Sequence, residues 1–311
     1  MASLINLLSV STGLNPHDVK AIIMRAPVSY KRYTIPKRSG GFRIIAQPAR
    51  EVKRLQRSLV ELLSGLPVHA AAAAYVRSLS IADNAARHSG NGPILKFDFK
   101  DFFTSLREKD WQEYCVRKAV FDDISDVMLS SRLLFHRVPD CRMLRLAIGA
   151  PSSPWLSNVL MHEFDEIITD LVGRDKVTYS RYADDLTFSA RRTGYLNGVE
   201  KSLRQTIAGL HTPRLTLNDD KTVLATMKYR RVVTGLVLAN DGRVTLGRDR
   251  KRRIRAALHH ASLGKLDREA LIQLSGMIAF VKSAEPAFFE QIAARYGGEI
   301  IARLSATPEA D

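Results

Sequence analysis

The order of strand-like and helix-like segments along the chain predicts an α+β fold. Two runs, residues 177–182 and 186–190, are rich in β-branched and aromatic residues and are joined by a tight turn, which is typical of a β-hairpin. Helical apolar spacing covers both ends of the chain, and strands do not alternate with helices in regular βαβ units. A doubly wound parallel sheet is therefore not expected.

The elements can be placed in chain order. Helical patterning over residues 2–25 breaks at Asn15-Pro16, and strands at 31–35 and 42–46 flank a Ser39-Gly40-Gly41 turn. The short alanine run at 70–74 is expected in a packed helix or turn. The other expected elements are helices at 50–64, 108–118, 123–136, 154–172, 198–210 and 248–305, and strands at 94–99, 177–182, 186–190 and within 214–246.

Charge and composition limit the classes of partner. The 311 residues include 47 Lys and Arg against 32 Asp and Glu, a net charge of +15, which favours a polyanion. Charge alone does not separate nucleic acid from an anionic membrane, but no apolar run reaches the roughly 18–20 residues of a spanning helix. Cys115 and Cys141 form neither a disulfide framework nor a zinc pattern, so a reducing cytoplasmic setting is expected.

Two adjacent carboxylates, Asp184 and Asp185, lie at the tip of the predicted hairpin in the run Tyr182-Ala183-Asp184-Asp185. Such a pair repels itself, and a divalent metal would remove the repulsion, which indicates metal-assisted phosphoryl transfer. The alternative is an ordinary turn, in which Asp side chains bond their own backbone.

A third carboxylate, Asp98, lies in the apolar strand-like stretch 94–99. A charge inside such a strand is unfavourable unless it is paired or bound to a metal. The alternative is an edge-strand Asp that points to water. Together with the hairpin, Asp98 completes the minimal acidic set for two-metal chemistry.

Taken in order, these motifs resemble a reverse transcriptase. The strand ends in Phe97-Asp98-Phe99-Lys100-Asp101-Phe102-Phe103, and Gly149-Ala150-Pro151-Ser152-Ser153-Pro154 and the Tyr-Ala-Asp-Asp hairpin follow. More specifically, the chain resembles the bacterial retron enzymes, through Asn84-Ala85-Ala86-Arg87-His88, Val233-Thr234-Gly235-Leu236 and the segment 35–48. The resemblance runs from about residue 26 to 304.

The resemblance implies a right-hand polymerase fold of fingers, palm and thumb, in which an antiparallel palm sheet carries the hairpin. The expected divisions are an N-terminal helical extension at 1–25, fingers at 26–92, a palm with a finger-derived helical insert at 93–240, and a helical thumb at 241–311.

The resemblance also assigns metal ligands. Asp98 and Asp184 match the firm ligands, Asp185 matches a looser one, and the carbonyl of Phe99 joins them. Two Mg²⁺ ions are expected, with Mn²⁺ as an alternative, because both metals accept carboxylate and water oxygens.

Further residues are expected around the nucleotide. The backbone at Asp101 and Phe102 would hold the triphosphate, and Phe103 matches the steric gate against a 2′-hydroxyl, although both rings also suit a core. The small residues of the loop that begins at Gly149 would let the template-primer backbone approach the protein closely. Three basic residues complete this set: Arg43 and Lys37 as phosphate clamps on the fingers hairpin, and Lys221 as general acid for pyrophosphate, each with a solvated surface charge as the alternative.

RNA or primer contacts are expected from three places. Asn84 and His88 lie four residues apart and would share a helix face. The Val233, Thr234 and Gly235 run matches a primer- or RNA-contacting strand at the base of the thumb. A helix opening the thumb has six basic residues in eight, with Arg248, Lys251, Arg252 and Arg255 along one side.

The resemblance therefore implies an RNA-directed DNA polymerase that uses dNTPs. Its product would be short single-stranded DNA branched from a cognate structured noncoding RNA through a 2′-hydroxyl, and it would act in antiphage defence with effector proteins. Details of the fingers and C-terminal segments resemble retrons paired with an ATPase and an HNH-type nuclease. Two alternatives stay open: a non-retron bacterial reverse transcriptase, and an RNA-binding scaffold whose catalysis is dispensable.

Overall fold

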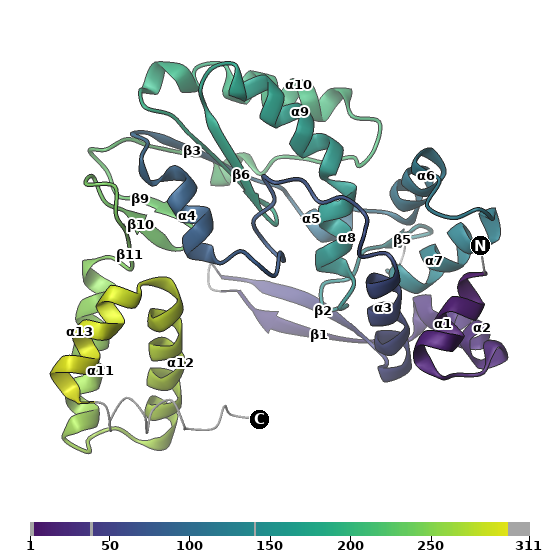
Figure 1. The fold of residues 1–311 in the computed structure, drawn as a ribbon, viewed down its shortest axis with the longest axis horizontal. Coiled ribbons are helices and arrows are strands. Elements are labelled where there is room, and N and C mark those ends of the chain that lie inside the picture. The colour runs from purple at the N-terminus through teal and green to yellow at the C-terminus, as the bar shows by residue number, and fades with distance from the viewer. Residues whose placement is uncertain (1–2, 38–39, 140, 298–311) are drawn as a thin grey trace.

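A computed structural model describes residues 3–37, 40–139 and 141–297 and shows an α+β protein, as predicted (Figure 1). Ser39 of the expected turn and the end of the last expected helical region, residues 298–305, lie outside the described residues. In Figure 1 the N-terminal and C-terminal helices lie at opposite ends of the molecule, and the sheets lie between them.

The N-terminal end consists of α1 (Leu4–Thr12) and α2 (Pro16–Arg25). The side chain of Asn15 caps α2 by accepting a hydrogen bond from its backbone, and proline suits the first helical position. Both helices pack against α3 (Arg50–Leu62) and α7 (Ile124–Leu134) in the main hydrophobic core. The predicted break between the first two helices is confirmed.

A long antiparallel hairpin follows, made of β1 (Tyr30–Pro36) and β2 (Phe42–Pro48). Its outer part is exposed, including the side chain of Phe42. At its base the N–H of Ala46 donates to the carbonyl of Ile148 at 2.8 Å. The hairpin is therefore fastened where it meets the loop before α8 (Ser153–Leu160) and is open to solvent toward its tip.

The central sheet has the strand order β6-β7-β3-β8, and each neighbouring pair is antiparallel. Apolar residues of this sheet pack against α9 (His162–Gly173), which lies with α10 (Val199–Gly209) along one side of it (Figure 1). The four strands are β3 (Ile94–Asp98), β6 (Thr178–Tyr182), β7 (Asp185–Ser189) and β8 (Val223–Ala225).

A second, smaller core joins α4 (Ile81–Ser89), a three-stranded sheet and the C-terminal helices. The sheet has the order β11-β10-β9. Its strands and the helices that follow are β9 (Arg231–Val233), β10 (Leu236–Leu238), β11 (Val244–Thr245), α11 (Arg248–Ser262), α12 (Arg268–Ala284) and α13 (Pro286–Tyr296). The remaining elements are α5 (Phe102–Ser105), α6 (Glu108–Lys118), β4 (His136–Arg137), β5 (Leu144–Arg145) and the short 3-10 turns Ala26–Val28, Thr193–Leu196 and Asp219–Lys221.

Several elements differ in detail from the sequence-based expectation. The helix expected at 154–172 is two helices, because the chain turns at Met161 between α8 and α9. The alanine run, expected in a packed helix or turn, begins in a turn at Ala70 and Ala71, and Ala72 then forms a parallel bridge with Arg181 of β6. The short strands β4 and β5 were not predicted, because two residues carry too little alternation to be recognised.

Candidate active site

The three predicted acidic residues meet at one end of the central sheet. Asp98 ends β3 and pairs in register with Asp185, the first residue of β7. The N–H of Phe99 donates to the carbonyl of Asp184 at 3.0 Å, which fixes the hairpin turn against the end of β3. Asp98 is only 6% exposed. The alternative of an edge-strand Asp that points to water is therefore excluded, since β3 has β7 on one side and β8 on the other.

The buried guanidinium of Arg181 holds the hairpin turn in place. Ala183 has a φ of +57°, an uncommon conformation for a residue with a side chain. Its carbonyl accepts a hydrogen bond from Arg181 at 3.2 Å, and Arg181 forms an ion pair with Asp165 of α9 at 2.6 Å. Both charged side chains are fully buried. The position of the catalytic turn thus depends on a contact between β6 and α9.

The electrostatics of the cluster favour a cation. Burial raises the pKa of Asp184, and the charges of Asp98 and Asp185 raise it further. Burial also raises the pKa of Asp185, although Lys96 opposes this effect. The ammonium of Lys221 donates to both carboxylate oxygens of Asp98 at 2.9 Å, and this bond raises the pKa of the lysine. Excess negative charge at one point is what a divalent metal would neutralise.

The carboxylates fit metal ions in chemistry but are not arranged around one. Across the residues that the structure describes, no three Asp, Glu, His or Cys side chains already surround a common point at ligand distance. At this site Lys221 donates a hydrogen bond to each carboxylate oxygen of Asp98. Three carboxylates of like charge, at the end of β3, in the turn from β6 to β7 and at the start of β7, are nevertheless a donor set that Mg²⁺ accepts.

The segment after Asp98 places one aromatic ring inside and one at the surface of the site. Asp101 has a φ of +49° and begins the short helix α5. Phe102 is 3% exposed and stacks on Phe99, which confirms its expected place in the core. Phe103 is half-buried, so its outer edge is available to a ligand.

Gly149 packs against the fingers-like hairpin rather than facing open space. Its φ is +119°, and a Cβ there would come within 2.9 Å of the Ile45 methyl and 3.1 Å of the Ala46 carbonyl oxygen. The need for glycine is therefore explained by contact within the chain. Close approach of template-primer backbone is not required to account for it.

The basic residues of the hairpin lie near its tip. Lys37 and Arg43 are both exposed, and Lys37 closes the turn through backbone bonds with Gly40 and Gly41. The charge of Arg43 lowers the pKa of Tyr75, whereas that of Asp184 raises it.

The comparisons with known proteins agree with this geometry. Residues 35–253 match the family model described as reverse transcriptase (RNA-dependent DNA polymerase). The chain is 37% identical over 290 residues to the retron Ec83 reverse transcriptase of Escherichia coli, with 91% of this chain and 92% of that protein aligned. It is 35% identical to the retron Mx162 reverse transcriptase of Myxococcus xanthus, with 91% of this chain and 63% of that protein aligned.

The chain belongs to the retron reverse transcriptases. It is an RNA-dependent DNA polymerase with the right-hand polymerase fold. The fold is also that of telomerase from Candida albicans in complex with a fragment of telomeric RNA, with a TM-score of 0.50 at 14% identity, over 91% of this chain and 66% of that one. Members of the family use divalent metals, in agreement with the carboxylate cluster.

Two residues expected to contact RNA in this reverse transcriptase are buried. His88 has no exposed surface and lies between Ser189 Oγ at 2.7 Å and Ser180 Oγ at 2.8 Å, on the two strands of the catalytic hairpin. Asn84 is 1% exposed, one turn earlier on α4. Burial argues against direct contact of either side chain with RNA, and the two hydrogen bonds of His88 make it a support of the hairpin.

The Val233-Thr234-Gly235 run is a tight turn rather than an exposed strand. Val233 is fully buried, and the turn from β9 to β10 has positive φ at both Thr234 (+47°) and Gly235 (+80°). This is the pattern of a two-residue hairpin turn. The Thr234 hydroxyl donates to the carbonyl of Ile81, so the turn is tied to the start of α4.

The basic side of α11 divides into two groups. Lys251 forms an ion pair with Glu285 at 2.5 Å and is 22% exposed, so it joins α11 to the start of α13. Arg255 lies over the ring of Phe288 at 5.0 Å. Arg248 and Arg252 are exposed. The RNA contact predicted for all four stays a prediction, and Lys251 differs from the others in its ion pair with Glu285.

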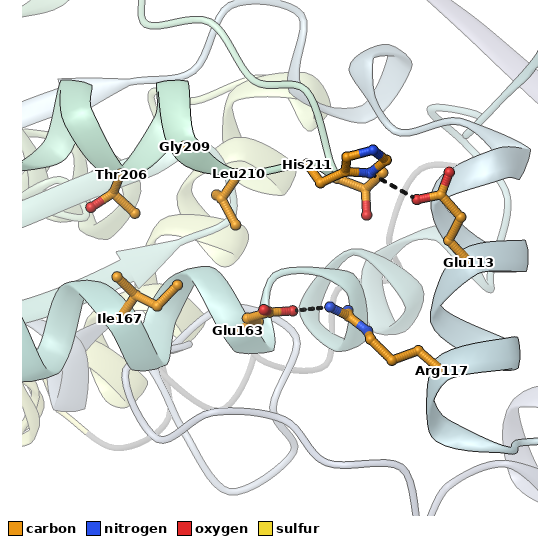
Figure 2. Close-up of a pocket in the computed structure, with 9 residues that line it drawn as sticks. Glu113, Arg117, Glu163, Ile167, Thr206, Gly209, Leu210 and His211 are labelled. Atoms are coloured by element: carbon orange, nitrogen blue, oxygen red, sulfur yellow. Dashed lines mark ion pairs between the residues drawn. The ribbon is translucent and has the colours of Figure 1, made fainter.

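The best-formed cavity of the described residues lies elsewhere (Figure 2). It has a volume of about 550 Å³ and lies between α6, α9 and the end of α10. Two ion pairs cross it, Arg117 with Glu163 at 2.6 Å and His211 with Glu113 at 3.3 Å. None of the carboxylates of the candidate site lines it.

In the described part of the chain no helix is long and apolar enough to cross a membrane.

Proposed function

We propose that this enzyme polymerises DNA on an RNA template at Asp98, Asp184 and Asp185, which would hold two Mg²⁺ ions, with Mn²⁺ as an alternative. The observation that carries the proposal is the pairing of Asp98 with Asp185 on adjacent antiparallel strands, with Asp184 in the hairpin turn that bonds to the end of β3. When bound, the metals would activate the primer hydroxyl and neutralise the triphosphate. The carbonyl of Phe99 would complete the ligand set.

The chain's own residues would do the remaining work. Lys221 lies at the cluster, where it would protonate departing pyrophosphate after leaving Asp98. Phe103 would press against the sugar of the incoming dNTP, above the backbone of Asp101 and Phe102 at the triphosphate. Arg43 and Lys37 would reach the phosphates from the hairpin.

The division into fingers, palm and thumb is supported by the elements themselves. The hairpin β1–β2 would belong to the fingers at 26–92, the four-stranded sheet to the palm at 93–240, and α11 to α13 to the thumb, which begins at 241. Helices α1 and α2 would form the extension at 1–25. Exposed Arg248, Arg252 and Arg255 of the thumb would contact phosphates of the duplex.

The biological setting is inferred from the family. Similarity to retron enzymes over about nine-tenths of the chain supports a cognate structured noncoding RNA as template and a short single-stranded DNA, branched from a 2′-hydroxyl of that RNA, as product. It also supports antiphage defence in the cytoplasm with effector proteins, for which an ATPase and an HNH-type nuclease are our candidates.

The test uses the protein purified from cells that carry its native locus. Its nucleic acid is extracted and treated with ribonuclease, deoxyribonuclease or debranching enzyme, beside an Asp184→Asn/Asp185→Asn control. We expect a discrete short DNA whose mobility changes after debranching and which the control lacks. RNA alone in both samples would refute polymerisation and favour the scaffold. Unbranched DNA in the wild type alone would retain the polymerase and exclude priming from a 2′-hydroxyl.

A further inference from the structure

The alanine run leads directly to Tyr75, whose ring contacts Phe103 of the candidate active site. Ala72 bridges Arg181 of β6, the N–H of Ala73 donates to the carbonyl of Arg181 at 2.8 Å, and the N–H of Arg181 donates to the carbonyl of Ala71 at 2.8 Å. The run is thereby a short parallel addition to the edge of the catalytic hairpin. The next residue after it is Tyr75.

The backbone at Tyr75 is held in an unfavourable conformation. Its φ is +63°, which is rare for a bulky residue and adds strain of about 1–3 kcal/mol in general. The preceding carbonyl, of Ala74, accepts a hydrogen bond from Asn158 at 2.8 Å, and Asn158 in turn accepts one from Arg181 at 3.2 Å. The buried network that holds the catalytic turn therefore also holds this residue.

The ring of Tyr75 is not needed for the core. It is 50% exposed, and its neighbours along the run, Ala71 to Ala74, are buried. A half-exposed ring on a strained backbone contributes little to stability, since the strain offsets much of what the buried half gains. Such strain in a well-anchored segment is typical of a functional position.

The ring completes a row of aromatic residues that leads outward from the core. Phe99 stacks on Phe102 at 5.7 Å, Phe102 meets Phe103 at 5.4 Å, and Phe103 meets Tyr75 edge to face at 6.3 Å. The last two rings are the ones with exposed surface. Phe103 is thus backed by the core on one side and by Tyr75 on another.

The charges around Tyr75 are those expected around a nucleotide. Asp184 raises and Arg43 lowers the pKa of the phenol, while burial raises it most. The phenol is therefore within electrostatic range of a candidate metal ligand and of a candidate phosphate clamp.

We propose that Tyr75 is a specificity-determining residue, whose ring braces Phe103 in the position from which it excludes the 2′-hydroxyl of a ribonucleotide. The inference rests on the proposed role of Phe103 as the steric gate. Removal of the brace lets the gate ring rotate away from the sugar, so that ribonucleotides enter more readily while deoxynucleotides are still accepted.

The experiment measures kcat/KM for single additions of dNTP and of the matching rNTP on an RNA template with a DNA primer. Tyr75→Ala and Tyr75→Leu are expected to lower the preference for dNTP about three- to tenfold, the range for loss of one aromatic contact. Tyr75→Phe retains the ring and is expected to keep the wild-type preference. Tyr229→Ala is the matched control, because Tyr229 is 71% exposed and outside the site.

Phe103→Ala separates failure of this inference from failure of the gate. If Phe103→Ala loses the preference and both Tyr75 variants retain it, the brace is refuted and the gate stands. If Phe103→Ala itself retains the preference, the gate and the brace are both refuted. An equal change of KM for dNTP and rNTP in the Tyr75 variants would also overturn the inference, since it indicates general weakening of binding. The leucine variant keeps a bulky apolar side chain, so the test stands if the alanine variant folds poorly.

Discussion

The buried ion pair between Asp165 and Arg181 offers the sharpest test of how the catalytic turn is positioned. Asp165 accepts three hydrogen bonds from the Arg181 guanidinium, at 2.6, 2.9 and 3.1 Å, and one from the Tyr179 hydroxyl at 2.8 Å. Both charged side chains are fully buried. Asp165→Asn keeps the shape of the side chain and leaves the guanidinium without a counter-charge.

Breaking one side of a buried pair in this way destabilises a protein by about 3–5 kcal/mol. Replacing both partners by apolar residues is often neutral, because no buried charge is left unpaired. We therefore expect Asp165→Leu/Arg181→Met to be more stable than Asp165→Asn, although it lacks every bond of the pair. Polymerase activity is expected to fall in both variants, because the hydrogen bond from Arg181 to the carbonyl of Ala183 is weakened or lost.

The assay is urea unfolding followed by circular dichroism, alongside primer extension. Glu163→Gln provides the matched control on the same helix, because Glu163 forms an ion pair with Arg117 in which the side chains are 44% and 50% exposed. Exposed pairs contribute at most about 1 kcal/mol. Equal shifts of the urea midpoint in Asp165→Asn and Glu163→Gln would refute the argument, as would a double variant less stable than the single one.

Three further predictions concern other parts of the chain. Burial lowers the pKa of His88 from 6.5 to about 4, so the stability that its neutral form provides is present above pH 6.5 and is lost, by about 3 kcal/mol in all, as pH falls toward 4. The free energy of unfolding, measured between pH 7 and 5, should therefore depend less on pH in His88→Gln than in the wild type. Equal pH dependence in the two proteins would contradict this. Gly149→Ala should lower the melting temperature, through a destabilisation of about 1–3 kcal/mol from the contact with Ile45 and the positive φ, and an unchanged melting temperature would show that the loop yields. Arg252→Met should reduce the slope of log binding constant against log salt concentration, for duplex binding, by about one unit. Lys251→Met should leave this slope unchanged and lower the stability of the protein. The reverse pattern would refute the division of the basic helix into two groups.

Local patterns predicted the catalytic end of the sheet well, for a physical reason. Asp98 and the hairpin aspartates are recognisable because charges are unfavourable in apolar strands, and because strand propensity on both sides of a tight turn defines a hairpin. The pairing register then follows, because a shift of β3 by one residue against its neighbour would turn each of its apolar side chains to the opposite face of the sheet. The antiparallel pairing of Asp98 with Asp185 is the outcome.

The supports of the site were missed because their partners are distant in the sequence. Asp165 and Asn158 read as ordinary helix residues, and only the packing of α8 and α9 under β6 brings them to Arg181. Burial of His88 likewise depends on serines about 90 to 100 positions away, at 180 and 189. Patterns in one sequence report secondary structure and local chemistry, but not which polar groups satisfy one another across elements.

The alanine run is one support of the site that can be recognised in the sequence. Consecutive alanines suit a helix by propensity, but here four small side chains lie where a segment runs flat against β6 and beside α8. A larger side chain would hold the segment away from the hairpin and break its backbone bonds with Arg181. One requirement then explains why the alanine run is followed directly by Tyr75. The backbone must approach the hairpin closely, and the ring of Tyr75 must lie at the edge of that hairpin. If that requirement is correct, Ala73→Val should reduce dNTP preference as Tyr75→Ala does, although it leaves the ring itself unchanged.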